Sequence, residues 1–233
     1  MDDITFADTW PDRSASPLTV PWPDQGNPGA VRNLTRAAEW LDLIRACNLH
    51  GAVPMIVVAR FDLAQKLYAY GWLEDGFVKA GELAAVVALE LGLLDRYGGQ
   101  IAVPQVKKRN EGPAKAKGKP RPPMLHDLLR HMVEKEGLTD SLLPSARLYG
   151  PVVSRLYMSE EEREARMGTF VEPPTTLVGI RNGLAHGDPY DGLPWGGLLE
   201  LVRDLIEYAY RHMTAEALDH LRATGQTHHA TGR

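Results

Sequence analysis

The chain of 233 residues has one cysteine, Cys47, no long apolar run and no excess of basic residues. A single cysteine excludes an internal disulfide framework. No apolar stretch reaches the roughly 18 residues that a membrane span needs, and the acidic start MDDITFADTW is unlike a signal peptide, which begins basic and continues apolar. These absences predict a cytoplasmic protein that does not enter a membrane.

The composition that remains is typical of a globular protein. Hydrophobic residues make up 44% of the chain, which is enough to bury a sizeable core. The 26 Lys and Arg residues are outnumbered by 30 Asp and Glu residues, which gives a net charge of −4. This balance argues against a protein that coats nucleic acid or membrane with its whole surface, but it leaves room for a local basic patch.

Apolar residues recur at helical intervals along most of the chain, which predicts an all-α helical bundle without strands. The strongest pattern covers residues 75–99 and is Ala- and Leu-rich. We expect it to form the central core helix, with Glu82, Glu90 and Asp95 facing solvent. Prolines at the starts and glycines at the ends of other patterns mark further helices. These cover residues 33–49, 54–71, 124–137, 160–168, 173–187 and 194–221.

The two ends of the chain fall outside this helical pattern. Residues 1–30 contain five prolines among Asp, Ser and Gly, and we expect an extended N-terminal arm anchored by Trp10 and Trp22. Residues 31–222 then form the all-α domain. The polar tail 223–233 is expected to be disordered.

Residues 144–174 read as an insertion within the all-α domain. The segment fits no helix of the expected bundle, and it carries an acidic stretch, EEEREARMG. Ser159 and Glu162 have the spacing of a capping box, in which each side chain bonds the backbone N–H of the other residue. The insertion is therefore expected to contain one short polar helix.

A basic loop covers residues 105–123 and has no hydrophobic periodicity. Seven cations face a single acidic residue, Glu111, among prolines and glycines. The loop is either a solvated linker or a contact to the RNA backbone, because flexible cations can follow phosphates without reading sequence. The candidate RNA-binding residues are Lys107, Lys108, Arg109, Lys115, Lys117, Lys119 and Arg121.

Three polar residues stand close together in the segment GIRNGLAHGD, namely Arg181, Asn182 and His186. On a regular helix the offset of five residues turns Arg181 and His186 about 140° apart, so they share a face only if the helix end unwinds, which Gly187 permits. A helix C-terminus carries unpaired carbonyls and negative partial charge, so one interpretation is that both cations stabilise the helix end. Asn182 is also a common residue near a helix end.

The same segment resembles the motif of the HEPN superfamily (higher eukaryotes and prokaryotes nucleotide-binding domains). In that motif an arginine, usually beside a polar residue, precedes a histidine by four to six intervening residues, which here are Arg181, Asn182 and His186. The surrounding order is similar too: an Ala-rich helix with an acidic residue near ALELGLLDR, the helix LHDLLRHMVEKEGL, the motif and a closing amphipathic helix. The resemblance covers residues 54–213.

The resemblance implies a homodimer in which the motifs of two protomers face one another, through the motif helix or through residues 194–221. Many such proteins are metal-independent endoribonucleases without a cofactor, in toxin–antitoxin or phage-defence systems where an antitoxin protein silences the toxin. RNA supplies its own nucleophile, the 2′-hydroxyl, so His186 would move a proton and Arg181 would stabilise charge on the phosphate. Asn182 would orient the histidine or hold a ribose hydroxyl. The open alternative is a noncatalytic module that binds RNA or a nucleotide, or that scaffolds partners.

The remaining histidines do not predict a metal site. His126 and Asp127 adjoin, as in HD phosphohydrolases, but the sequence offers no convincing set of further ligands. His126 and His131 are five residues apart, which is the wrong spacing for one helical face. We therefore interpret His126 as a structural histidine of its helix.

Overall fold

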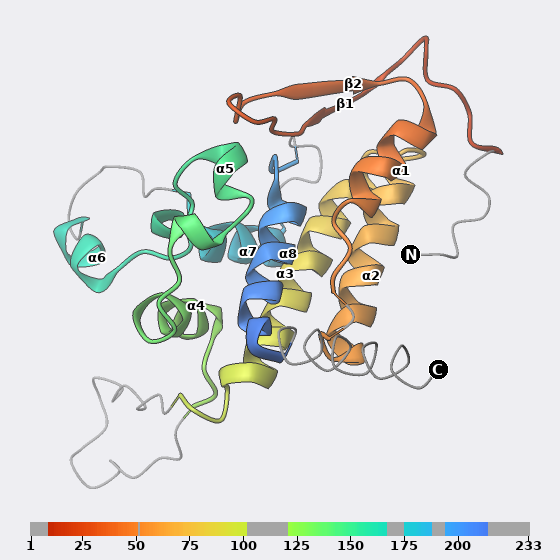
Figure 1. The fold of residues 1–233 in the computed structure, drawn as a ribbon. Helices are drawn as coiled ribbons and strands as arrows, with labels where there is room; N and C mark the ends of the chain where they lie inside the picture. Colours follow the sequence, from red (N-terminus) through yellow and green to blue (C-terminus); the bar gives the residue numbers. More distant parts are fainter. Residues whose placement is uncertain (1–8, 51, 102–120, 167–174, 188–193, 214–233) are drawn as a thin grey trace, which may run out of the picture.

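The structure is a computed structural model, and it describes residues 9–50, 52–101, 121–166, 175–187 and 194–213 (Figure 1). Within these ranges the chain is mostly helical with one two-stranded sheet, which confirms the predicted all-α class. The strands are β1 (Leu18–Pro21) and β2 (Val31–Leu34). The helices are α1 (Ala37–Arg45), α2 (Met55–Tyr70), α3 (Gly76–Tyr97), α4 (Leu125–Glu134), α5 (Ala146–Tyr149), α6 (Glu160–Arg166), α7 (Leu177–His186) and α8 (Leu198–Ala209).

Helix α3 is the centre of the bundle, as the sequence predicts, and it contacts α2, α4, α7 and α8. Figure 1 shows α2, α3 and α8 running side by side, with α4 to α7 gathered on one side of them. Gly81, Ala85, Ala88 and Gly92 recur along α3 and are all buried. A Cβ at Gly81 would lie 2.5 Å from the ring of Tyr68 on α2, so the glycine permits the close approach of the two helices.

Helix α1 is attached to α2 by buried polar contacts. The indole N–H of Trp40 donates to the carbonyl of Tyr68 at 2.8 Å. The Gln65 amide donates to the carbonyl of Ile44 and to the Asn48 side chain, both at 3.0 Å. Each bond satisfies a polar group inside an otherwise apolar interface, so α1 has a fixed register on α2.

The N-terminal segment forms a hairpin that packs on the helices, where the sequence predicted an extended arm. β1 and β2 pair antiparallel, with Leu18 opposite Leu34. Leu18, Val20 and Trp22 are buried. The rings of Trp22 and Trp40 pack edge to face, with their centroids 5.4 Å apart. Residues 9–30 therefore cover one end of the core (Figure 1).

The prediction of no strand was wrong, and the physical reason is the length of the strands. Each has four residues, and Pro21 ends β1, so the alternation of apolar and polar residues is too short to recognise. The helix predicted over 33–49 is correspondingly shorter. It begins at Ala37, because Val31–Leu34 belongs to β2, and it ends at Arg45.

The closing helix α8 begins at Leu198, later than predicted. Gly197 adopts a φ of 77°, and a Cβ there would lie 2.2 Å from the ring of Tyr149. The apolar face of α8, including Leu205, is buried inside the chain, so this helix does not present that face to a second copy. Residues 214–233 lie outside the described residues, as does the expected tail.

Two glutamates are buried in the core, against the prediction for one of them. Glu82 on α3 was expected to face solvent, but it is 0% exposed, pairs with Lys79 at 3.1 Å and accepts the backbone N–H of Trp195. Burial raises the pKa of Glu82 to about 6. Glu200 on α8 is 6% exposed, and burial raises its pKa to about 7. Asp95, in contrast, is exposed as predicted.

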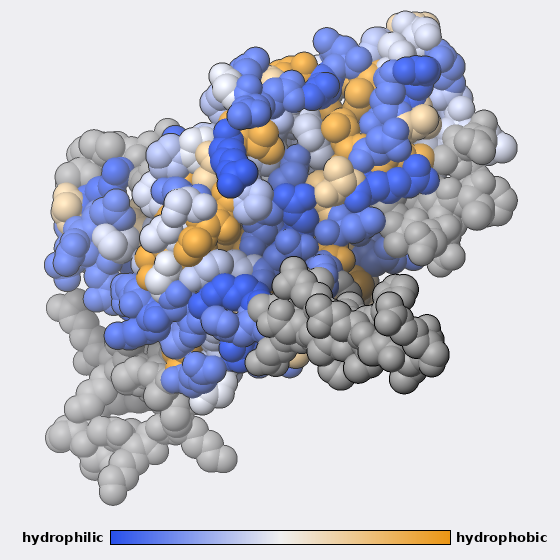
Figure 2. All heavy atoms as spheres, in the orientation of Figure 1, coloured by the Kyte–Doolittle hydropathy of each residue, from blue (hydrophilic) through white to orange (hydrophobic). Residues whose placement is uncertain are grey.

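Apolar side chains on the surface stand in separate groups between hydrophilic ones on the face that Figure 2 shows. Among the described residues, no helix has both the length and the apolar character that crossing a membrane requires.

We predict that Glu200→Gln flattens the dependence of stability on pH. The pKa of Glu200 is about 7 in the folded protein and about 4.3 in an unfolded chain. The folded state therefore binds the proton more tightly, and the free energy of unfolding falls as pH rises from about 4.5 through 7. Between pH 5 and 8, the free energy of unfolding measured in urea should fall further in the parent than in Glu200→Gln. The difference should be on the order of 1–3 kcal/mol.

The exposed residue Glu74 supplies the matched control for this measurement. Glu74→Gln removes the same charge from a solvated position and should keep the pH profile of the parent. Parallel profiles for the parent and Glu200→Gln would contradict the buried, proton-binding state of Glu200.

Candidate functional site

Four helices meet around a pocket of about 280 Å³ that is open to solvent. Helix α3 contributes Glu90, and α7 contributes Arg181 and Asn182. The start of α4 forms another wall, and α6 reaches the pocket from the side. The lining residues are Glu90, Arg121, Met124, Leu125, His126, Asp127, Arg163, Val178, Arg181 and Asn182.

Arg181 is held in this pocket by an ion pair with Glu90. The Nη2 and Nε atoms of the guanidinium donate to Glu90 Oε2 at 3.0 and 3.3 Å, and Nη1 donates to the Asn182 side-chain oxygen at 3.3 Å. The Arg181 and Glu90 side chains are 28% and 20% exposed. Glu90 is therefore partly buried and paired, and not simply solvated as its place in the helical pattern suggested.

His186 does not line this pocket, although it belongs to the same motif. Helix α7 stays helical to His186 and ends only at Gly187, whose φ is 88°. The helix end therefore does not unwind before Gly187, and a regular helix keeps Arg181 and His186 about 140° apart, as their offset of five residues indicates. Asn182 and His186 are exposed, so within one chain the histidine faces solvent while the arginine faces α3.

The basic loop reaches the same pocket through its last cation. Arg121 lines the pocket and pairs with Asp127 at 2.9 Å. Burial alone would raise the pKa of Asp127, but the Met124 amide and the Arg121 guanidinium outweigh it, so the pKa lies below its ordinary value. The other six candidate RNA-binding residues lie outside the described residues, namely Lys107, Lys108, Arg109, Lys115, Lys117 and Lys119.

His126 is a pocket residue that the sequence interpretation missed. It occupies the first turn of α4 and lines the same pocket as Arg181. Its ring meets the edge of the Tyr157 ring at 5.2 Å. Burial lowers the pKa of His126, and the charge of Arg163 lowers it further, so the imidazole is mostly neutral at pH 7. The pocket that contains His126 is also lined by Glu90 and Arg181, which are 91 positions apart in the chain. No local sequence pattern could have shown that these residues share a pocket.

Arg163 lines the pocket and lies in residues 144–174, the segment that the sequence predicts to be an insertion. The predicted capping box is confirmed: the Ser159 amide donates to Glu162 at 2.9 Å, and the Glu162 amide donates to the Ser159 hydroxyl at 3.1 Å. This box starts α6, which carries Arg163 in its last turn. Part of residues 144–174 therefore belongs to the wall of the pocket.

Comparison of the chain with protein-family models, curated proteins and solved structures gave no significant match. The HEPN resemblance therefore depends on the residues quoted for it. In the part of the chain that the structure describes, no three His, Cys, Asp or Glu side chains gather closely enough to hold a metal ion.

We predict that the Arg181–Glu90 pair is energetically coupled. A double-mutant cycle with Arg181→Gln and Glu90→Gln should give a coupling free energy of about 0.5–1 kcal/mol in urea unfolding, because both side chains are partly removed from water. The Arg36–Glu39 pair on α1, whose Arg36 side chain is 71% exposed, is the control. Its coupling should be smaller, because solvent screens an exposed ion pair. A coupling of zero for Arg181–Glu90 would show that the pair does not hold the arginine.

Proposed function

We propose that the protein binds RNA and cleaves it as a HEPN-type, metal-independent endoribonuclease, with Arg181 and His186 in the reaction centre. The observation that supports this most is the convergence of Arg181, Asn182 and Arg121 on one solvent-open pocket. Two of these residues come from the motif, and the third comes from the basic loop, although the sequence singled out the two segments for independent reasons.

The residues suffice for cleavage by the 2′-hydroxyl of RNA itself. The 2′-oxygen bonds to phosphorus and gives up its proton, while the bond from phosphorus to the 5′-oxygen breaks and that oxygen takes a proton. Arg181 offers a planar set of donors to two phosphate oxygens and stays charged throughout. His186 would transfer the proton between these oxygens. Asn182 contributes an amide for a ribose hydroxyl.

The division between Arg181 and His186 favours a composite site built from two copies of the chain. Within one chain the two side chains leave α7 in different directions, so a phosphate on Arg181 would meet a histidine from a second copy more directly. The exposed side of α7, with Asn182, Ala185 and His186, is the surface that would face that copy. In a toxin–antitoxin or defence setting, an antitoxin protein would cover the same surface.

The alternative function is a noncatalytic module that binds RNA or a nucleotide. The specific observation in its favour is that His186 is absent from the lining of the pocket that holds Arg181. In that case Arg181 and Arg121 bind phosphate, and no proton is transferred.

We predict that the purified protein cuts single-stranded RNA in excess EDTA and leaves DNA intact, because DNA lacks the 2′-hydroxyl. The products should carry a cyclic phosphate on one side and a free 5′-hydroxyl on the other. His186→Ala should lower the rate about 10²–10⁴-fold with little loss of RNA binding. Arg181→Ala should do comparable damage and also weaken binding. Gel electrophoresis of end-labelled RNA measures the rate and the product ends.

His212→Ala is the matched control, because His212 is also exposed and lies beyond α8. It should cleave as the parent does, and the melting temperature of each variant checks the fold. Equal cleavage by His186→Ala and the parent would reject the catalytic proposal and favour the noncatalytic module.

We predict a separate role for the loop in binding. Replacing Lys107, Lys108 and Arg109 by Ser should flatten the salt dependence of RNA affinity by roughly 0.7 log unit of slope per lost phosphate contact. The charge-matched control replaces three exposed cations elsewhere, Arg60, Lys135 and Arg147, by Ser. If both triple variants change the slope equally, the effect comes from net charge and the loop is only a linker.

A further inference from the structure

Among the described residues, the pocket cation Arg163 is paired with no carboxylate. Arg181 pairs with Glu90, and Arg121 pairs with Asp127. Among the residues that the structure describes, no ion pair joins Arg163 to an acidic side chain. Three guanidinium groups and two carboxylates therefore line the pocket, so the charged lining has a net positive charge. The additional guanidinium is that of Arg163 on α6.

We propose that this pocket binds one phosphate group of a ribonucleotide or RNA, and that Arg163 and His126 contact the phosphate together with Arg181. Arg163 supplies the positive charge that no carboxylate among the described residues neutralises. Arg181 is fixed by Glu90 through Nε and Nη2 on the side toward α3. The proposal assigns a function to α6 and to His126, neither of which belongs to the motif.

The chemistry of the lining fits a phosphate better than a carboxylate or a metal. Guanidinium groups arrive from three separate segments, so they can reach different oxygens of a tetrahedral anion. A neutral His126 adds one N–H donor without requiring a proton from solution. The two carboxylates that line the pocket, Glu90 and Asp127, are already paired with arginines. A bound metal cation would have to compete with those arginines for the carboxylates. The volume of about 280 Å³ is near the lower end of small-molecule sites, which suits one nucleotide.

His126 reports directly on such binding, because charged groups surround it on two helices. Arg163 and Glu160 face it from α6, and Asp127 and Arg130 face it from α4. A phosphate bound beside the ring adds negative charge and so raises the pKa of His126. A purely structural histidine, in contact only with Tyr157, would not change its pKa when phosphate is added.

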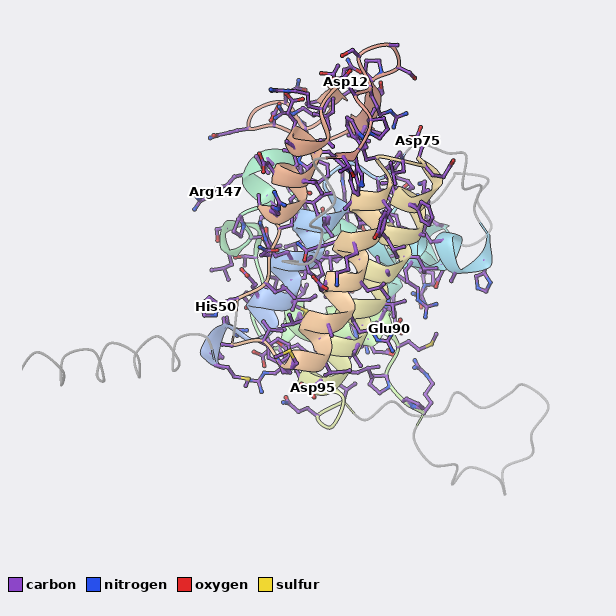
Figure 3. All side chains as sticks on the ribbon, turned by 90° about the vertical axis from the view of Figure 1, so that its right-hand side faces the viewer. Asp12, His50, Asp75, Glu90, Asp95 and Arg147 are labelled. Carbon is purple, nitrogen blue, oxygen red and sulfur yellow. The ribbon has the colours of Figure 1, made fainter. Side chains whose placement is uncertain are left out.

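The test is a titration of the full-length protein with inorganic phosphate, followed by NMR of the ¹⁵N-labelled histidines against sodium chloride of equal ionic strength. His126 should shift saturably and its pKa should rise, while the exposed His212 should not respond; His126→Gln assigns the signal. Arg163→Ala should weaken phosphate binding about tenfold, since a hydrogen-bonded charge is lost. Arg147→Ala is the matched control: Arg147 is also exposed and lies on the other side of the molecule from Glu90 (Figure 3).

Equal phosphate affinity in Arg163→Ala and the parent, or a pKa of His126 that phosphate does not change, would overturn the inference. This inference deepens the proposed function, but the two can fail separately. If the protein binds phosphate through Arg163 but does not cleave RNA, the ribonuclease proposal is rejected and the phosphate pocket stands. If the protein cleaves RNA but Arg163→Ala leaves KM unchanged, the ribonuclease proposal stands and the phosphate pocket is rejected.

Discussion

The close packing of α2 on α3 is the constraint on which the rest of the structure depends. The two helices approach so closely that a side chain at Gly81 would overlap Tyr68, and a Cβ at Gly92 would lie 3.2 Å from a methyl group of Val57. Because the buried stripe of small residues fixes which side of α3 meets α2, it also fixes which side is left for α4, α7 and α8. Glu90 lies on that remaining side, where it can meet an arginine of α7.

The Arg181–Glu90 pair then joins the motif to the core. Surface ion pairs stabilise proteins little, so the value of this pair is mainly positional: it holds a guanidinium at the edge of a pocket instead of letting it sample solvent. A phosphate that approaches the pocket meets an arginine whose direction is already set. The cost of ordering a long side chain on binding is correspondingly reduced.

Local patterns predicted the helices well and the relations between them poorly. The apolar periodicity of α3 and the capping box at Ser159 are properties of neighbouring residues, and both are confirmed. The hairpin was missed because its strands are shorter than the pattern that reveals strands. Glu82 was misplaced because its burial depends on Lys79 and on the backbone of Trp195, which is distant in the chain. The separation of His186 from Arg181 agrees with their offset of five residues, because α7 stays helical to His186.

That separation changes what the motif can mean in a single chain. Because α7 remains helical up to Gly187, Arg181 lines the solvent-open pocket between α3, α4 and α6, and His186 lies on the exposed side of α7. The histidine that lines the pocket is His126 of α4, and the pocket cation without an acidic partner in the described part of the chain is Arg163 of α6. The phosphate contacts that we propose for this pocket therefore come from one chain and do not include His186. In the proposed reaction, Arg181 would bind the phosphate and His186 of another copy would transfer the proton, so the two roles would belong to two different surfaces.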